Sequence, residues 1–317
     1  MSAEDQIVTL LERNMYAGRK PWTVFEDWLD VVLATTTMMP AHMEAAIKTG
    51  KPAEDPPDVA VLWSRLNKTY GRDDWDNFRE AYRLLVETVH DRMTNQDKSD
   101  NNSWDILGSV YMALNVSSNH AGQYFTPWSA AHIMAAMLTP NMGEEVAQRL
   151  RAAVECVKDS AERALLDSSV LLACAADDEN MFHNVILPTL ATYVEPITVH
   201  DPCCGSGIML LAVAARVPNW ARHWGIVRFY GQDIDATCVK MAQVNMMLYG
   251  LNGFGLRVQL AMQGVGKELQ RKHYEQEGIR LEPQSNQRPV IIPVPVPVAE
   301  AITPATEHLP GGQLTLF

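Results

Sequence analysis

The stretch His200-Asp-Pro-Cys-Cys-Gly-Ser-Gly-Ile-Met-Leu210 decides the fold of this chain. Before it, Pro196-Ile-Thr-Val-His200 alternates apolar and polar residues, which is typical of a short strand. After it, Ile208-Met-Leu-Leu-Ala-Val-Ala-Ala-Arg216 contains only apolar residues and helix formers, so the sequence predicts a strand, a tight turn and a helix. Gly205 and Gly207 have no Cβ atom and let the backbone turn sharply, while the helix directs free N–H groups at the turn.

Two acidic residues mark this turn as a candidate binding site. Asp201 ends the first predicted strand, and ligands of open α/β sheets bind at the carboxyl ends of the strands. The pattern D-x-x-x-G-x-G fits a site for S-adenosylmethionine, a nucleotide site or a plain tight turn. Asp233 ends a second predicted strand about 26 residues beyond Gly207, where nucleoside-binding sites place the acceptor for the ribose hydroxyls.

The residues between the two acids narrow the choice of ligand. The turn has neither the Lys and Ser/Thr of a phosphate loop nor a full G-x-G-x-x-G. S-adenosylmethionine is therefore favoured over ATP or a dinucleotide.

Composition limits the class of protein. The chain has 317 residues, 47% of them hydrophobic, which is enough for one large domain or two ordinary ones. Its formal net charge is -12, so DNA contact would need a local basic face or a partner subunit. Five cysteines without a C-x-x-C pair argue for reduced thiols in the cytoplasm and against a zinc site. The acidic N-terminus is no signal peptide, and no apolar run approaches the roughly 18 residues of a membrane helix.

The order of patterns along the chain predicts three regions. Residues 1–120 carry apolar residues at helical spacing and are expected to form a helical N-terminal region. Residues 121–280 are expected to form the domain around the glycine turn, with a helical insertion at about 144–190 and a third strand at Leu256–Leu260. Residues 281–317 are Pro-rich and predict a flexible tail without a fold of its own.

Four motifs follow one another over about residues 104–260. They are Asp105-Ile-Leu-Gly108 with Tyr111, Gly122-Gln-Tyr-Phe-Thr-Pro127, Asp201-Pro-Cys-Cys-Gly-Ser-Gly207, and Gly231-Gln-Asp-Ile-Asp235 with Asn245 and Gly250. Together they resemble the N-6 adenine-specific DNA methyltransferases, in particular the modification subunits of type I restriction systems, and they occur in that family's order. The resemblance implies an α/β fold, with a partial Rossmann-like domain that binds S-adenosylmethionine behind a helical N-terminal region, and it implies DNA as the substrate.

The resemblance also implies roles for single residues. Phe125 and Thr126 would hold the methionine end of S-adenosylmethionine, and the glycine turn would lie beneath it. Asp233 would accept hydrogen bonds from the ribose hydroxyls, and Ile234 would pack on the adenine. The implied cofactor-binding residues are Gln123, Tyr124, Phe125, Thr126, Asp201, Pro202, Gly205, Ser206, Gly207, Asp233 and Ile234.

The catalytic motif of that family is missing. An Asn, Asp or Ser followed by Pro-Pro and an aromatic residue binds the adenine amino group and stacks on the flipped base. Nothing after Leu260 matches, and the one Pro-Pro of the chain, in Asp55-Pro-Pro-Asp58, lies in an N-terminal loop with Asp58 in place of the aromatic residue. The catalytic residues stay unknown, and the lone chain is expected to be inactive. It could be a degenerate relative, one half of a split enzyme completed by a second methyltransferase subunit, or an enzyme with an unrecognised catalytic loop.

The last residues, Gly311-Gly-Gln-Leu-Thr-Leu-Phe317, resemble the peptide that binds the bacterial sliding clamp. Leu314, Leu316 and Phe317 would be apolar anchors, and Gln313 would fix their register by hydrogen bonding. The alternative is that Leu316 and Phe317 fold back onto their own domain. The tail supports a second hypothesis, that of a non-catalytic regulatory protein recruited to DNA through the clamp.

Overall fold

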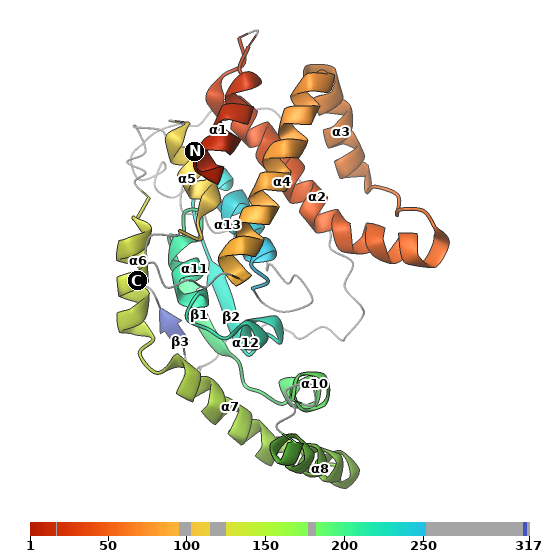
Figure 1. Cartoon of the computed structure of the whole chain (residues 1–317), viewed down its shortest axis with the longest axis vertical. Coiled ribbons are helices and arrows are strands. Elements are labelled where there is room, and N and C mark those ends of the chain that lie inside the picture. Colours follow the sequence, from red (N-terminus) through yellow and green to blue (C-terminus); the bar gives the residue numbers. More distant parts are fainter. Residues whose placement is uncertain (17, 95–102, 115–124, 177–181, 252–312, 316–317) are drawn as a thin grey trace, which may run out of the picture.

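The computed structural model describes residues 1–16, 18–94, 103–114, 125–176, 182–251 and 313–315. Helices dominate, and one small parallel sheet lies among them (Figure 1). The N-terminal part contains α1 (Ala3–Arg13), α2 (Pro21–Thr49), α3 (Pro57–Thr69), α4 (Arg72–Thr94) and α5 (Ile106–Ala113). Next come α6 (Trp128–Leu138), α7 (Met142–Cys156), α8 (Ser160–Ala176), the π-helix η1 (Phe182–Ile186) and α10 (Leu187–Ala191). The last elements are β1 (Ile197–Asp201), α11 (Ile208–Ala214), α12 (Asn219–His223), β2 (Val227–Gly231), α13 (Ala236–Leu248) and β3 (Gln313–Thr315).

The N-terminal helices are delimited by local signals in the sequence. α1 begins with a capping box, in which the Ser2 hydroxyl accepts the Asp5 N–H and the Asp5 carboxylate accepts the Ser2 N–H, both at 3.1 Å. α2 begins with Pro21 in its first turn and ends at Gly50, whose φ of 74° is left-handed. α1 packs along α4, and the aromatic side chains of Trp28 on α2 and Phe78 on α4 are fully buried.

A buried polar cluster around Asp74 connects the loops that precede α2 and α4. Asp74 is 1% exposed and accepts hydrogen bonds from the Tyr16 hydroxyl at 2.8 Å and the Gly71 N–H at 2.9 Å. Arg19 adds an ion pair at 3.2 Å. Because a buried carboxylate is costly unless its oxygens are paired, these donors fix the loops before α2 and α4.

The sheet has the strand order β2-β1-β3. β1 and β2 run parallel, with the register Ile197↔Val227 at one end and Asp201↔Gly231 at the other. Ile197, Val199 and Asp201 point to the buried side of β1, whereas the residues between them are half-buried. β3 pairs in parallel with the other edge of β1, because that edge offers N–H and C=O groups that need partners.

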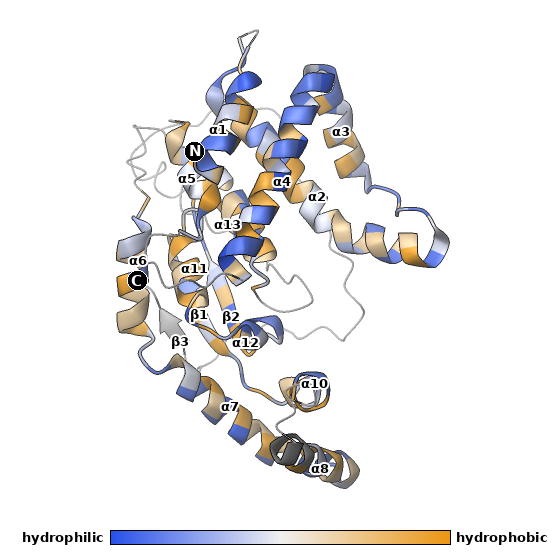
Figure 2. Cartoon of the chain, in the orientation of Figure 1, coloured by the Kyte–Doolittle hydropathy of each residue, from blue (hydrophilic) through white to orange (hydrophobic). Residues whose placement is uncertain are grey.

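Two helices join the sheet to the rest of the molecule. All seven residues of α11 are buried, and this helix packs against both β1 and α6. Figure 2 shows apolar colours along α11 and hydrophilic ones along much of α4. α13 packs on α2, where Thr237 donates to Glu26 at 2.8 Å and Lys240 forms an ion pair with Asp30. The N-terminal helices are therefore attached to the β1–β2 layer through α13.

The fold agrees in part with the sequence-based expectation. Both predicted strands are present, and the helix after the glycine turn begins where it was predicted, but helices make up most of the described structure. The expected third strand at Leu256–Leu260 lies outside the described residues. The tail differs from the expectation at Gln313–Thr315, which forms a strand on β1 rather than a segment without structure. No helix of the described chain combines the length and the apolarity needed to cross a membrane.

Gly231 provides a test of packing at the end of β2. A Cβ atom there would lie 2.9 Å from Cys204 Sγ and 3.0 Å from Leu210 Cδ1. We expect Gly231→Ala to lower the free energy of unfolding by about 1–3 kcal/mol, because the neighbours must shift. Urea denaturation measures this.

Gly143→Ala is the matched control. It lies in α7 with no atom within 4 Å of an added Cβ, so its stability should be unchanged or raised by up to about 1 kcal/mol. Equal stability of the two variants would contradict the packing described for β2.

Candidate functional site

The turns after β1 and β2 meet at one edge of the sheet. Asp233, in the turn after β2, accepts the Gly205 N–H through Oδ2 at 2.8 Å. Its Oδ1 accepts the Asp235 N–H at 2.9 Å. One carboxylate thus connects two segments that are distant in the sequence. Asp233 lies beside the glycine turn, as the spacing of the acids predicted.

The glycine turn has a conformation that side chains disfavour. Gly205 has a φ of 54° and Gly207 a φ of 92°, both in the left-handed region. The Gly207 N–H donates to the Cys204 carbonyl at 2.7 Å, and the Cys204 N–H donates to the Gln232 carbonyl at 2.8 Å. The turn is therefore tightly closed and tied to the segment that follows β2.

A third segment reaches the turn through Phe125. The Phe125 ring lies 3.5 Å from the position that a Cβ atom on Gly205 would occupy. Its other side meets Tyr111 of α5 edge to face, with ring centroids 5.5 Å apart. Thr126 follows as a half-buried residue, and Pro127 caps α6. Gln123 and Tyr124, which belong to the same motif, lie outside the described residues.

The remaining predicted residues differ in how far they face solvent. Asp201 is 2% exposed, and its Oδ1 accepts the Cys203 N–H at 3.0 Å. Burial raises the pKa of Asp201, and the charge of Asp233 raises it further. Pro202 is half-buried. Ile234 is 68% exposed, so an apolar side chain stands uncovered beside Asp233.

Ser206 points away from the open side of the turn. It is fully buried, and its hydroxyl donates to Asp105, the capping residue of α5. Asn245 of α13 donates to the same carboxylate at 3.1 Å. Asp105 and Asn245 belong to the motifs quoted from the sequence, but no role was predicted for either residue. The structure groups them directly behind the turn.

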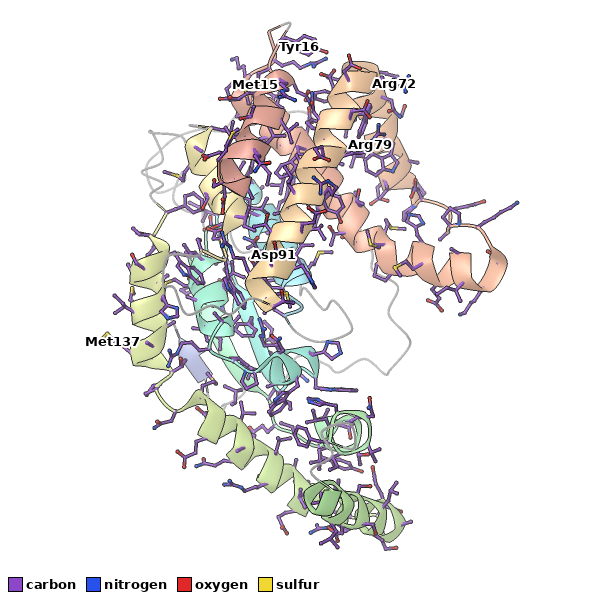
Figure 3. The ribbon with its side chains drawn as sticks, viewed as in Figure 1. Met15, Tyr16, Arg72, Arg79, Asp91 and Met137 are labelled. Atoms are coloured by element: carbon purple, nitrogen blue, oxygen red, sulfur yellow. The ribbon has the colours of Figure 1, made fainter. Side chains whose placement is uncertain are left out.

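The described residues were also compared with the requirements of a metal site, a disulfide and a separate surface pocket. No group of His, Cys, Asp and Glu among the described residues could hold a metal ion. The described cysteines whose side chains are placed, Cys156, Cys203, Cys204 and Cys238, are free thiols. A surface pocket of about 350 Å³ lies between α3 and α4, where Figure 3 labels Arg72 and Arg79, and contains none of the turn residues.

Comparison with known families now decides the kind of domain. Residues 182–273 match the family model of the N-6 DNA methylases. This segment of the chain is similar to the N-6 DNA methylases. The matched segment runs from η1 through β1, the glycine turn and β2 to α13, and its last part, 252–273, lies outside the described residues. No curated protein and no solved structure matches the chain.

The match confirms the family that the sequence motifs indicated. The N-6 DNA methylase segment includes the two motifs around Asp201 and Asp233. The other two motifs precede it, yet their residues Asp105 and Phe125 lie against the glycine turn. The structure therefore brings described residues of all four motifs to the turn.

The buried carboxylate of Asp201 leads to a prediction about pH. Because its pKa in the folded protein is raised above the ordinary 3.8, the unfolded chain ionises first as the pH rises. The contribution of Asp201 to stability is thus greatest at low pH and is lost as the pH rises toward the folded pKa. We expect Asp201→Asn to become more stable than the wild type, by a margin that grows as the pH rises above about 4.

Urea midpoints between pH 4 and 7 measure this difference. Asp91→Asn is the control, because Asp91 is an exposed carboxylate on α4 (Figure 3). A difference between Asp201→Asn and the wild type that does not change with pH would contradict the described environment of Asp201.

Proposed function

We propose that the turns after β1 and β2 bind S-adenosylmethionine and that the chain is the cofactor-binding part of a DNA adenine N-6 methyltransferase. The observation that carries the proposal is the hydrogen bond from Gly205 N–H to Asp233, with Phe125 on the same glycine. These contacts bring a glycine turn, a carboxylate and an aromatic ring to the carboxyl edge of parallel strands. Ligands of open α/β sheets bind at this edge.

The residues present suit the chemistry of this cofactor. Each oxygen of Asp233 accepts one backbone N–H, which orients the carboxylate and leaves a lone pair on each oxygen for a ribose hydroxyl. Ile234 offers an exposed apolar side chain for the adenine. The Phe125 ring can lie against the positively charged sulfonium, because aromatic faces attract cations. When bound, S-adenosylmethionine supplies a methyl group for transfer.

The wider organisation follows from this site. Residues 121–280 would form the methyltransferase region with a partial Rossmann-like core, of which β1, β2, α11 and α13 are one part. Residues 1–120 would form the N-terminal region and contact that core through α2 and α13. We place this protein in the cytoplasm, in keeping with its free thiols.

The part that handles the target base would come from a second subunit. Pro56 caps α3 and Pro57 opens it, so the one Pro-Pro pair serves as a helix start, and a first-turn Asp58 follows it. The chain would then bind DNA weakly by itself, which agrees with its net charge of -12. We therefore favour one half of a split enzyme, of the kind found in restriction–modification, or a degenerate relative that keeps the cofactor site.

Cofactor binding tests the proposal directly. We expect the purified chain to bind S-adenosylmethionine in a calorimeter, and Asp233→Ala to weaken binding roughly 10- to 100-fold. Hydrogen bonds to a charged group contribute about 1.5–3 kcal/mol each, which corresponds to that range.

Asp91→Ala, at an exposed carboxylate of α4, is the control and should bind as the wild type does. Unchanged affinity in Asp233→Ala would remove the ribose role of Asp233. In the same preparation, methyl transfer from labelled cofactor to DNA by the lone chain would exclude both the split and the degenerate form.

A second candidate function rests on the C-terminal residues. The sequence Gln313-Leu-Thr-Leu-Phe317 resembles the clamp-binding peptide, and the main chain of Gln313–Thr315 pairs with β1 in this structure. Recruitment by the sliding clamp would bring an acidic protein to DNA. A main chain paired in the sheet is withdrawn from other partners, so clamp binding would require the release of β3.

The competition between pairing of the tail with β1 and binding of the tail to the clamp can be measured. We expect the free peptide 309–317 to bind the clamp more tightly than the whole chain does, because the chain must first release β3. Deleting Leu316 and Phe317 should abolish clamp binding and leave the affinity for S-adenosylmethionine unchanged. Clamp binding that survives this deletion would refute the role of the tail.

A further inference from the structure

A buried carboxylate lies directly behind the glycine turn. Asp105 is 2% exposed and caps α5, with its Oδ1 accepting the Gly108 N–H at 2.9 Å. The same Oδ1 accepts from Asn245 Nδ2 at 3.1 Å, and Oδ2 accepts from the Ser206 hydroxyl. Donors from α5, α13 and the turn therefore meet on one side chain. Because a buried carboxyl group is costly unless its oxygens are paired, this arrangement depends on all three donors.

The hydrogen bonds of Asp105 and Asn245 hold the middle residue of the glycine turn. Ser206 lies between the two left-handed glycines, Gly205 and Gly207. Besides the hydroxyl bond to Asp105, the Ser206 carbonyl accepts from Asn245 Nδ2 at 2.9 Å. Both the side chain and the main chain of Ser206 are thus held. Asn245 is 1% exposed, and its Oδ1 has no hydrogen-bond partner in the described structure, so its donors alone orient the amide.

α5 packs so closely against the turn that a side chain at position 108 has no space. A Cβ atom on Gly108 would overlap Asp105 Oδ2 and lie 2.8 Å from Ser206 Oγ. A larger residue at 108 would push the carboxylate away from the turn. Tyr111, one turn further along α5, meets Phe125, which lies against Gly205. α5 is therefore connected to the turn through the hydrogen bond of Asp105 with Ser206 and through the ring contact of Tyr111 with Phe125.

We propose that Asp105 is a positioning residue for the cofactor, which it does not touch: by holding Ser206, it fixes the main chain of Gly205 and Gly207 in the binding conformation. This inference rests on the proposed cofactor site. Glycine residues have the greatest conformational freedom of any residue, so a turn built from them needs external restraint. Restraint before binding lowers the entropic cost of ordering the turn around a ligand. Asp105 thereby acts on the binding of a cofactor that it does not touch.

Two substitutions remove the restraint from opposite ends. Asp105→Asn keeps the shape and an acceptor for Gly108 but loses the charged acceptor for Ser206, and Ser206→Ala removes the hydroxyl. We expect each to weaken calorimetric binding of S-adenosylmethionine about tenfold, which corresponds to about 1.4 kcal/mol. Because both act through one contact, the double variant should be no weaker than about tenfold.

Asp74→Asn is the matched control. Asp74 is also a buried carboxylate that accepts a backbone N–H three residues away and two side-chain donors, but these partners lie in the loops before α2 and α4 and not at the glycine turn. It should lower the urea midpoint and leave the cofactor affinity within twofold of the wild type. If Asp74→Asn weakened binding as much as Asp105→Asn, the effect would reflect general stability, and the positioning role would be refuted.

Amide hydrogen exchange of the cofactor-free protein tests the positioning role of Asp105 separately from the proposed cofactor site. Asp105→Asn and Ser206→Ala should raise exchange in the segment 201–211, and Asp74→Asn should not. Failure of the wild type to bind S-adenosylmethionine would end the proposed function, whereas exchange would still decide whether Asp105 restrains the turn. Unchanged exchange in this segment, or additive losses of affinity in the double variant, would overturn the inference.

Discussion

The hydrogen bond between the Gly205 N–H and the Asp233 carboxylate is the interaction on which the site depends. It can form because β1 and β2 are parallel neighbours, so that both strands end at the same edge. The donor residue, Gly205, has a left-handed φ of 54°, a conformation that glycine adopts without the strain a side chain would bring. The sheet, the glycine and the acid thus depend on one another. Without the pairing of β1 and β2, the other features of the site would have no common position.

Much of the remaining structure holds this edge in place. α11 is wholly buried behind the turn, and α13 carries Asn245 toward Asp105. The N-terminal helices reach the same layer through the α2–α13 contact. In the part of the chain that the structure describes, helices therefore supply much of the packing around the small sheet and its edge. The methylase segment at 182–273 therefore relies on residues that precede it.

The sequence predicted the strands and the turn well, because their signals are local. Alternation in Pro196–His200 and the glycines at 205 and 207 specify strand and turn within a few residues. The meeting of Asp233 with Gly205 followed from a rule about parallel strands. The role of Ser206 could not be predicted, because its burial depends on α5, about 100 residues away in the chain. Likewise, the strand at Gln313–Thr315 depends on the free edge of β1 and has no local sequence signal that separates it from an extended tail.

The most direct test of the proposed cofactor site follows the backbone amide of Gly205 by nuclear magnetic resonance while S-adenosylmethionine is added. The Gly205 N–H lies on the hydrogen bond that joins the two turns, so a ligand at this edge must change its surroundings. We expect the amide signals of Gly205, Gly207 and Asp233 to shift together and to saturate at one cofactor per chain. Signals at these three residues that stay unmoved under saturating cofactor would contradict the account.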